Sequence, residues 1–398
     1  MKRIGLILFA VFFLGFIPGL YALEFGGILK ADIDVAGQDE TNTSGSIVIA
    51  PWVSVLFGEA ELYACAGLNT IIGDETFAAP ELIRLEFSSR LTPMISFRAG
   101  RITWQDPSRI VAQGRFDGAD FHFDLGNINV GVNALYTGLL FKNSAEINVS
   151  PTDPKDYGAK LDWGDFGSTY SAPRRFLLSA YGEFPGYPSG KGQLYAGLLA
   201  QFDLSDADEA FHAQYLLLRH TLAFNKFDLD LAGAVEMENT KADGMRFGFA
   251  YSLKGGWQTP ASITDRLSLC VAWASGEGDA TAAFFPVTTE AQSFVLKPIL
   301  SGMLIARVNY EARILPTLKA EIGGCYLVRT DSGSFTAPYL EDDSYPLGAE
   351  LVAGFYWVPF SDLSVSLKGG AFLPQAGTAF ADDAPVTWRV NIGTVFSF

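Results

Sequence analysis

The chain has 398 residues, of which 18% are charged and 14% are aromatic, with 41 glycines and a formal net charge of −16. Soluble domains usually carry about 25% charged residues, and beyond the N-terminus no stretch reaches the roughly 20 apolar residues of a membrane helix. A strongly acidic chain also argues against a nucleic-acid partner. The composition therefore favours a membrane β-barrel over a soluble enzyme.

Residues 1–22 are predicted to form a secretory signal peptide. Lys2 and Arg3 make a basic start, an apolar run follows until Pro18 and Gly19 interrupt it, and Ala22 offers a small residue at the cleavage point. The run is too short for a comfortable membrane span. An uncleaved anchor helix is the alternative interpretation. We expect residues 23–398 to form one barrel domain.

From residue 23 onward, apolar and polar residues alternate with the period of two that is typical of strands. Phe227, Leu229 and Leu231, for example, alternate with Asp228 and Asp230. We count about 18 such runs (16–18), most of them longer than the five or six residues of a soluble strand and long enough to cross a bilayer. The expected strands are 24–36, 45–57, 60–72, 81–90, 94–101, 115–125, 128–141, 174–184, 192–204, 211–224, 227–239, 245–257, 266–275, 302–314, 318–330, 347–358, 363–373 and 386–398.

The connections between these strands differ in length by parity. The long ones include 37–44, 102–114, 142–173, 276–301 and 331–346, whereas the others are tight or modest, such as 58–59, 126–127, 225–226, 315–317 and 359–362. Long extracellular loops and short periplasmic turns are typical of an all-β, antiparallel outer-membrane barrel with both termini on the short-turn side. The last strand should then pair with 24–36 and close the cylinder, with Arg389 and Asn391 facing the lumen.

On the face expected to point inward, basic residues outnumber acids, although the whole chain is acidic. A guanidinium-rich lumen would favour anionic solutes, but the same charges could simply pair with neighbours and keep the lumen hydrated, and both interpretations stay open. The residues expected to line the pore or to set its selectivity are Arg84, Glu86, Arg98, Arg101, Arg109, Arg115, Arg307, Glu311, Arg313, Arg329, Glu350 and Arg389.

Two long connections are candidates for folding into the pore. The connection 102–114 mixes aromatic, charged and apolar residues, and Trp104, Asp106 and Arg109 would form its constriction. The longest connection, 142–173, could line the mouth or fold inward as a lid. Either could instead be an ordinary surface loop.

The sequence offers no catalytic, metal-binding or cofactor-binding signature. The chain has only three histidines and three cysteines. The histidines show no arrangement with a serine that would suit nucleophilic catalysis, and the widely spaced cysteines suggest neither a disulfide framework nor a metal site. The acidic loops lack the spacing of an EF-hand. We therefore predict no enzyme activity, no cofactor and no metal.

Part of the sequence resembles the alginate-export family of outer-membrane porins. The resemblance is carried by Gly100, Arg101, Asp106, Arg109, Arg115, Phe116, Asp117 and Gly118, and by a second segment at 347–374. It implies a barrel of similar size whose arginine-rich lumen passes an anionic polysaccharide. Asp120 departs from the family pattern, which tends to have a basic residue there. The terminal Phe398 resembles the signal that the barrel-assembly machinery of outer membranes recognises.

These observations predict an outer-membrane porin, surrounded by lipid, for diffusion or guided passage of small hydrophilic and potentially anionic solutes. The alternative is a surface adhesin or structural barrel with a plugged lumen, in which the acidic loops carry the function. A fatty-acid channel is a weaker third interpretation, because no apolar hatch segment follows the signal peptide.

Overall fold

The computed structural model describes residues 22–73, 76–150, 153, 157–158, 160–187, 190–205, 210–240, 244–259, 264–278, 281–341 and 344–398. The expected signal peptide lies outside these residues except for Ala22, which begins the first strand. Several acids of the expected acidic loops, such as Asp74 and Asp342, also lie outside them. No helix in the described part of the chain is long and apolar enough to cross a membrane.

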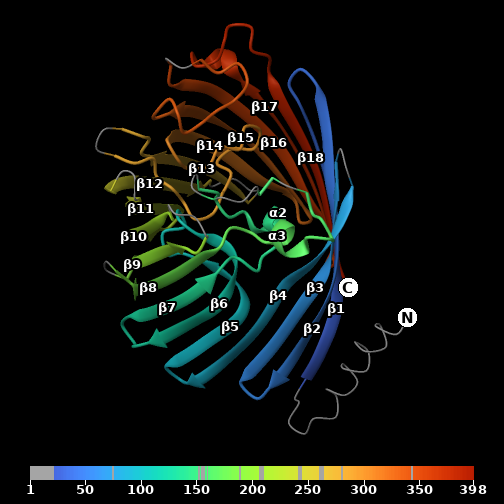
Figure 1. Ribbon diagram of the computed structural model, residues 1–398, viewed down its shortest axis with the longest axis vertical. Helices are drawn as coiled ribbons and strands as arrows, with labels where there is room; N and C mark the ends of the chain where they lie inside the picture. Colours follow the sequence, from blue (N-terminus) through green and yellow to red (C-terminus); the bar gives the residue numbers. More distant parts are fainter. Residues whose placement is uncertain are drawn as a thin grey trace.

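One antiparallel sheet of 18 strands accounts for nearly all regular structure in the described residues (Figure 1). Each strand pairs with the next one along the chain, and β1 (Ala22–Gly37) also pairs with β18 (Thr387–Ser397), which closes the sheet into a barrel. The strands between them are β2 (Thr41–Phe57), β3 (Ala60–Ile72), β4 (Phe77–Thr92), β5 (Ile95–Gln105), β6 (Gln113–Asp124), β7 (Asn129–Tyr136), β8 (Arg175–Pro185), β9 (Gly192–Asp203), β10 (His212–Phe224), β11 (Phe227–Thr240), β12 (Gly244–Gln258), β13 (Asp265–Ala274), β14 (Met303–Leu315), β15 (Leu318–Arg329), β16 (Pro346–Phe360) and β17 (Leu363–Leu373).

The expected all-β closed barrel is confirmed. The alternation in the sequence sorts side chains between the two faces of the wall. Leu216 and Leu218 on β10 are 56% and 54% exposed, whereas Tyr215 and Leu217, which alternate with them, are each 1% exposed. An apolar outer face is typical of a barrel that is surrounded by lipid, whereas a soluble barrel presents polar side chains on its outer face. Closure also leaves no open sheet edge along the β1–β18 junction.

Several boundaries differ from those expected from the sequence. The second strand begins at Thr41 and not at 45, so the expected long connection 37–44 is only the turn 38–40, and β4 begins at Phe77 and not at 81. The β5–β6 ladder continues to Gln105 and Gln113, so the connection between these strands is 106–112 and not 102–114. The strand continues because Ile102, Trp104 and Phe116 keep the alternation and bury their side chains inside the barrel. By contrast, β7 is shorter than expected, because it ends at Tyr136, five residues before the expected end at 141.

The barrel closes through a dense contact between its two ends. The amide of Gly27 donates to the carbonyl of Phe398 at 2.8 Å, and the amide of Phe398 donates back to Gly27 at 3.0 Å. Inside the barrel, Arg389 on β18 donates to Asp34 on β1 through Nη2 at 2.5 Å. As expected, the last strand pairs with the first, over residues 28–37 of β1, and Arg389 contacts Asp34 across this junction.

Gly26 allows this close approach. A Cβ at this position would lie 2.2 Å from the carbonyl oxygen of Phe398 and 2.8 Å from the ring of Trp52. Because the carbonyl oxygen of Phe398 belongs to the backbone, a side chain at position 26 could fit only if the two ends of the chain moved apart. Overpacking of this kind costs about 1–3 kcal/mol.

We expect Gly26→Ala to weaken the closing contact and to lower the temperature at which the folded barrel converts to its slower-migrating, heat-denatured form on SDS gels. Gly255→Ala on β12 is the matched control, because a Cβ there would meet nothing within 4 Å. Equal transition temperatures for the two variants would contradict the assignment of Gly26 to barrel closure.

Candidate functional site in the bore

Three loops fold into the bore and pack against its wall. We call them the hairpin loop (106–112), the long loop (137–174) and the crossing loop (275–302). Their buried apolar residues form one cluster with inward-facing side chains of the wall. In Figure 1 the two short helices of the long loop, α2 (Lys142–Ala145) and α3 (Phe166–Tyr170), lie inside the ring of strands. The loop members of the cluster are Val111, Ala112, Leu140, Ala145, Ile147, Ala172, Phe284, Val287 and Leu300, and the wall members include Ile102, Phe116, Leu135, Leu177, Leu199 and Leu217.

Backbone hydrogen bonds join the three loops into one body, which we call the loop body. The amide of Val287 in the crossing loop donates to the carbonyl of Val111 in the hairpin loop at 2.8 Å. Asn148 of the long loop donates to the carbonyl of Val287 at 2.9 Å, and Thr289 donates to Glu146 at 2.7 Å. Because buried backbone groups are costly to leave unpaired, these bonds fix the loops relative to one another as well as to the wall.

The hairpin loop is folded around the side chain of Asp106. Its carboxylate accepts hydrogen bonds from the amides of Ser108 at 2.7 Å, Arg109 at 3.0 Å, Val111 at 3.0 Å and Ala112 at 2.8 Å. Asp106 is therefore buried and shapes the loop from within. Arg109, with a positive φ of 59°, is exposed at the loop tip.

Trp104, which we expected in the constriction, lies on β5 and is buried. Its ring packs edge-on against Phe116 at a centroid distance of 5.9 Å. Of the three constriction residues expected from the sequence, the structure thus exposes only Arg109.

The crossing loop is attached to the wall at several points. On β11, Glu236 accepts the amide of Phe285 at 2.7 Å. On β16, Glu350 accepts the amides of Phe294 at 2.7 Å and Leu296 at 3.3 Å. Strands β11 and β16 are five positions apart in the sheet, so the loop extends across the bore from one part of the wall to another.

Arg307 and Arg329 also bind loop backbone. Arg307 donates to the carbonyl of Gln292 in the crossing loop. Arg329 is 1% exposed and donates to the carbonyls of Ser344 at 2.8 Å, Ser332 at 3.3 Å and Glu341 at 2.5 Å. The guanidinium of Arg329 therefore holds the connection 330–345 in place, and its burial keeps it away from the open part of the bore.

In that connection, Asp331 accepts the amides of Glu277, Gly333 and Ser334 at 2.6, 2.8 and 2.6 Å. Burial by itself would raise the pKa of Asp331, but these hydrogen bonds and that of the Ser334 hydroxyl hold the pKa below the ordinary aspartate value. The carboxylate is thus the form that joins the connection 330–345 to the crossing loop.

Other residues expected to line the pore form ion pairs on β4, β5 and β6. Arg84 donates to Glu86 at 3.0 Å and lies over the ring of Tyr63 at 4.6 Å. Arg98 is 2.5 Å from Asp120, a buried carboxylate. The side chains of Arg84 and Arg98 keep 42% and 34% exposure, so both remain accessible from the bore.

Arg101 pairs with Asp117 at 2.7 Å, and Arg115 pairs with Glu81 at 2.6 Å. Both pairs lie near the point where the pairing of β4 with β5 ends, at Leu85 and Arg101. Glu311 and Arg313 lie near the short-turn end of β14 and are exposed. Glu311 borders a small cavity of about 320 Å³ there.

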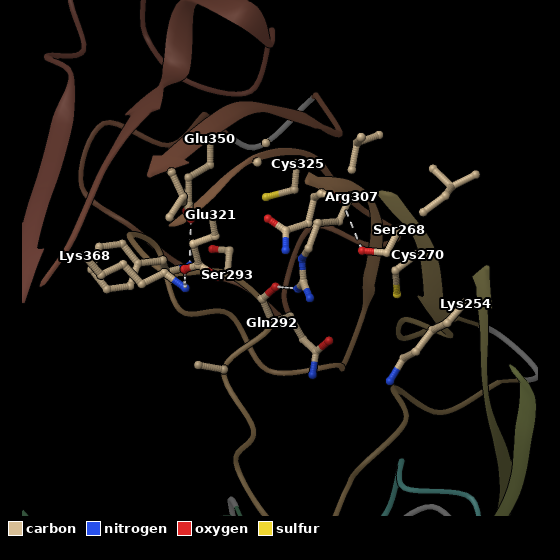
Figure 2. Close-up of a pocket in the computed structure, with 18 of the residues that line it drawn as sticks. Lys254, Ser268, Cys270, Gln292, Ser293, Arg307, Glu321, Cys325, Glu350 and Lys368 are labelled. Atoms are coloured by element: carbon tan, nitrogen blue, oxygen red, sulfur yellow. Dashed lines mark hydrogen bonds and ion pairs between the residues drawn. The ribbon is translucent and has the colours of Figure 1, made fainter. Parts of the chain in front are cut away.

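A larger polar chamber of about 610 Å³ lies between the crossing loop and strands β12 to β17. In Figure 2, Lys254 and Lys368 reach toward it from opposite sides, with Arg307 between them. Five cationic side chains and two carboxylates line it: Lys254, Arg266, Lys297, Arg307, Lys368, Glu321 and Glu350.

Most of these charges have partners. Lys368 is 2.9 Å from Glu321, and Arg266 is 2.6 Å from Asp228. Glu350 is occupied by the loop amides already described. Lys254, by contrast, is exposed and has no hydrogen bond or ion pair with any described residue. The chamber therefore keeps an excess of positive charge in a chain whose net charge is negative.

The structure brings together only part of the expected site. Lys254 and Lys368 were expected on the inward face from the alternation of their strands, whereas the inward fold of the crossing loop and the position of Lys297 on it were not predicted. The sequence of the loop carries a usable signal, because Phe284-Phe285, Phe294-Val295-Leu296 and Ile299-Leu300 are apolar clusters within a connection between strands. Among the described residues, no group of three or more His, Cys, Asp or Glu side chains could hold a metal ion.

No family model and no curated protein matches the sequence. Among solved structures, the barrel is similar to Pseudomonas aeruginosa OccK2 (OpdF) in complex with glucuronate, with a TM-score of 0.62 and 11% identity over 96% of this chain and 99% of that chain. It is also similar to P. aeruginosa OccD3 (OpdP), with a TM-score of 0.57 and 13% identity over 96% and 93%. For P. aeruginosa OccK5 (OpdH) the TM-score is 0.60, with 9% identity over 94% and 98%. The chain thus shares the whole fold of these Pseudomonas barrels.

Proposed function

We propose that the chain is an outer-membrane channel for small hydrophilic solutes and that it favours solutes with a carboxylate. The observation that carries the proposal is the cation-rich chamber beside the crossing loop. A partly desolvated cavity with surplus positive charge attracts anions and orients them through bidentate and point-charge contacts. Its mixture of cations, carboxylates and hydroxyl groups also suits the ring of a polar solute.

The similar solved structures support this proposal. They are outer-membrane porins, which are channels and not enzymes. One of them holds glucuronate, a sugar with a carboxylate. The resemblance to alginate-export porins leads to the same chemistry, because alginate is a chain of sugar carboxylates. We accordingly take a uronate as the first solute to test.

A structural barrel with a plugged lumen is the second candidate, since the loop body occupies part of the bore. The two candidates make opposite predictions about ion flow. A channel gives stepwise single-channel currents in a planar bilayer, whereas a folded barrel that conducts nothing would favour the structural or adhesive role.

We expect Lys254→Gln to lower the anion-over-cation permeability ratio about twofold, because even in water a unit charge contributes roughly 0.5 kcal/mol to the energy of an ion about 8 Å away from it. The reversal potential in a salt gradient measures this ratio, and glucuronate can be tested in the same cell. Lys226→Gln is the matched control, since it removes an equal charge from the β10–β11 turn. A ratio that is unchanged by Lys254→Gln, or equally changed by both, would contradict the role of the chamber.

We expect Glu350→Ala to release the crossing loop on the β16 side. The amides of Phe294 and Leu296 would lose their acceptor, and an unsatisfied buried group costs about 1–3 kcal/mol. Single-channel conductance should rise and become noisier. Glu311→Ala removes an inward-facing carboxylate that forms no hydrogen bond or ion pair with a loop among the described residues, and it should leave the noise unchanged. A quiet, unaltered current from Glu350→Ala would mean that the loop does not limit conduction.

We infer that residues 1–22 direct export and that Phe398 serves in assembly through the barrel-assembly machinery. The protein isolated from outer membranes should begin at Leu23, as N-terminal sequencing would show. Phe398→Ser should lower its amount in that membrane several-fold. Phe360→Ser is the control, because Phe360 is a similarly exposed aromatic residue, at 66% against 71%. If both variants lowered the amount of protein in the outer membrane equally, a special role for Phe398 in assembly would be contradicted.

A further inference from the structure

The barrel wall contains a seam between β4 and β5. These strands pair from Thr92–Ile95 up to Leu85–Arg101, and the pairing ends there. Beyond this point β5 continues with β6 as far as Gln105–Gln113, while β4 continues with β3 alone as far as Phe77. Residues 77–84 of β4 and 102–105 of β5 thus have no ladder between them, and β6 likewise loses its pairing with β7 beyond Asp117–Tyr136.

Side chains, in place of a ladder, cover the free strand edges at the seam. The carbonyl of Leu82 on β4 accepts Nη1 of Arg101 at 2.7 Å, and the carbonyl of Pro80 accepts the hydroxyl of Tyr170 at 3.0 Å. On β5, the carbonyl of Thr103 accepts Nη1 of Arg98 at 3.4 Å. Proline has no amide to pair, which suits an edge position. A bilayer requires such groups to be satisfied within the protein.

A short piece of the long loop, 139–145, lies at the seam, and we call it the wedge. It is attached in two ways: Leu140 and Ala145 bury apolar side chains in the core cluster, and polar contacts join the wedge to β4, β5 and β6. Arg101 donates to the carbonyl of Leu139 at 3.0 Å, and Arg115 donates to the carbonyl of Ser144 at 2.9 Å. The Ser144 hydroxyl donates to Glu81 at 2.5 Å, and Glu81 also pairs with Arg115. These polar contacts, together with the buried side chains of Leu140 and Ala145, hold the wedge at a place where no ladder joins β4 to β5.

The exposed side chains around the seam are mixed: Thr103 and Gln105 of β5 are polar, and three nearby leucines are apolar. Leu85, at the last paired position of β4, is 41% exposed, and Leu68 on β3 is 45% exposed. Leu139, at the start of the wedge, is 61% exposed. Acyl chains would meet these side chains, with two guanidinium groups, of Arg101 and Arg115, directly behind them.

We propose that the seam is a lateral opening, through which an acyl chain of an anionic membrane amphiphile reaches the wedge and its acidic head group meets Arg101 and Arg115. Opening the wall elsewhere would leave a row of backbone groups unpaired in lipid. Opening it here exchanges a small number of side-chain contacts, and the head group can replace the carboxylates of Asp117 and Glu81 as partner of the arginines. The inference requires the barrel to lie in a bilayer and does not depend on conduction through the chamber.

The test is access from the bilayer to the wedge. In a background with Cys65→Ser, Cys270→Ser and Cys325→Ser, Ser144→Cys is the reporter. The matched control is Ser268→Cys, because Ser268 is likewise half-buried and inward-facing but lies on β13, which is paired on both sides. Each variant is reconstituted in phosphatidylcholine vesicles that contain a minor fraction of phosphatidylcholine with a maleimide on one acyl chain. Labelling is normalised to that by a water-soluble maleimide.

We expect the normalised lipid labelling of Ser144→Cys to exceed that of Ser268→Cys at least tenfold. Adding Tyr170→Phe, which removes the hydroxyl that donates to the carbonyl of Pro80, should further accelerate the lipid labelling of Ser144→Cys. An anionic lipid without maleimide should slow this labelling by competition. Equal labelling of the two cysteines would overturn the proposal, and so would a Tyr170→Phe rate that is unchanged. Single-channel recordings of the same variants report separately on the aqueous channel.

Discussion

The arrangement inside this barrel depends on carboxylates that accept backbone amides. Asp106, Glu236, Asp331 and Glu350 each bind amides of a loop that would otherwise extend away from the barrel. A charged acceptor forms a stronger hydrogen bond than a neutral one, and its burial is tolerated only while those donors stay in place. Many polar side chains of the inner wall therefore bind loops of the protein itself, and only the remaining polar side chains are available to a solute.

This division explains why the expected arginine-lined pore is only partly realised. Arg329 and Arg307 bind carbonyls of the connections between strands, and Arg101 and Arg115 bind the wedge. Arg84, Arg98 and Lys254 keep exposed charge. Positive charge facing the bore is accordingly concentrated in two places, near the ion pairs of β4 and β5 and in the chamber of β12 to β17.

The sequence predicted the barrel well because the alternation of apolar and polar residues is a local property. The runs around Phe227 and around Trp388 define their faces without knowledge of the remaining chain. The loops are different, because their positions depend on partners far away in sequence, such as Val287 with Val111 and Phe294 with Glu350. Asp106 illustrates the limit. An acid in a mixed loop suggests a solute contact, yet its carboxylate is used by the amides of the loop itself.

The crossing loop also has a mechanical consequence. Because it is fixed to β11 at Glu236 and to β16 at Glu350, it acts as a tie across one sector of the cylinder. A tied sector resists flattening under lateral pressure, so the remaining circumference must absorb most of the change in shape. The seam between β4 and β5 lies outside the tied sector. Compression of the membrane would thus be relieved first where the wall has no ladder.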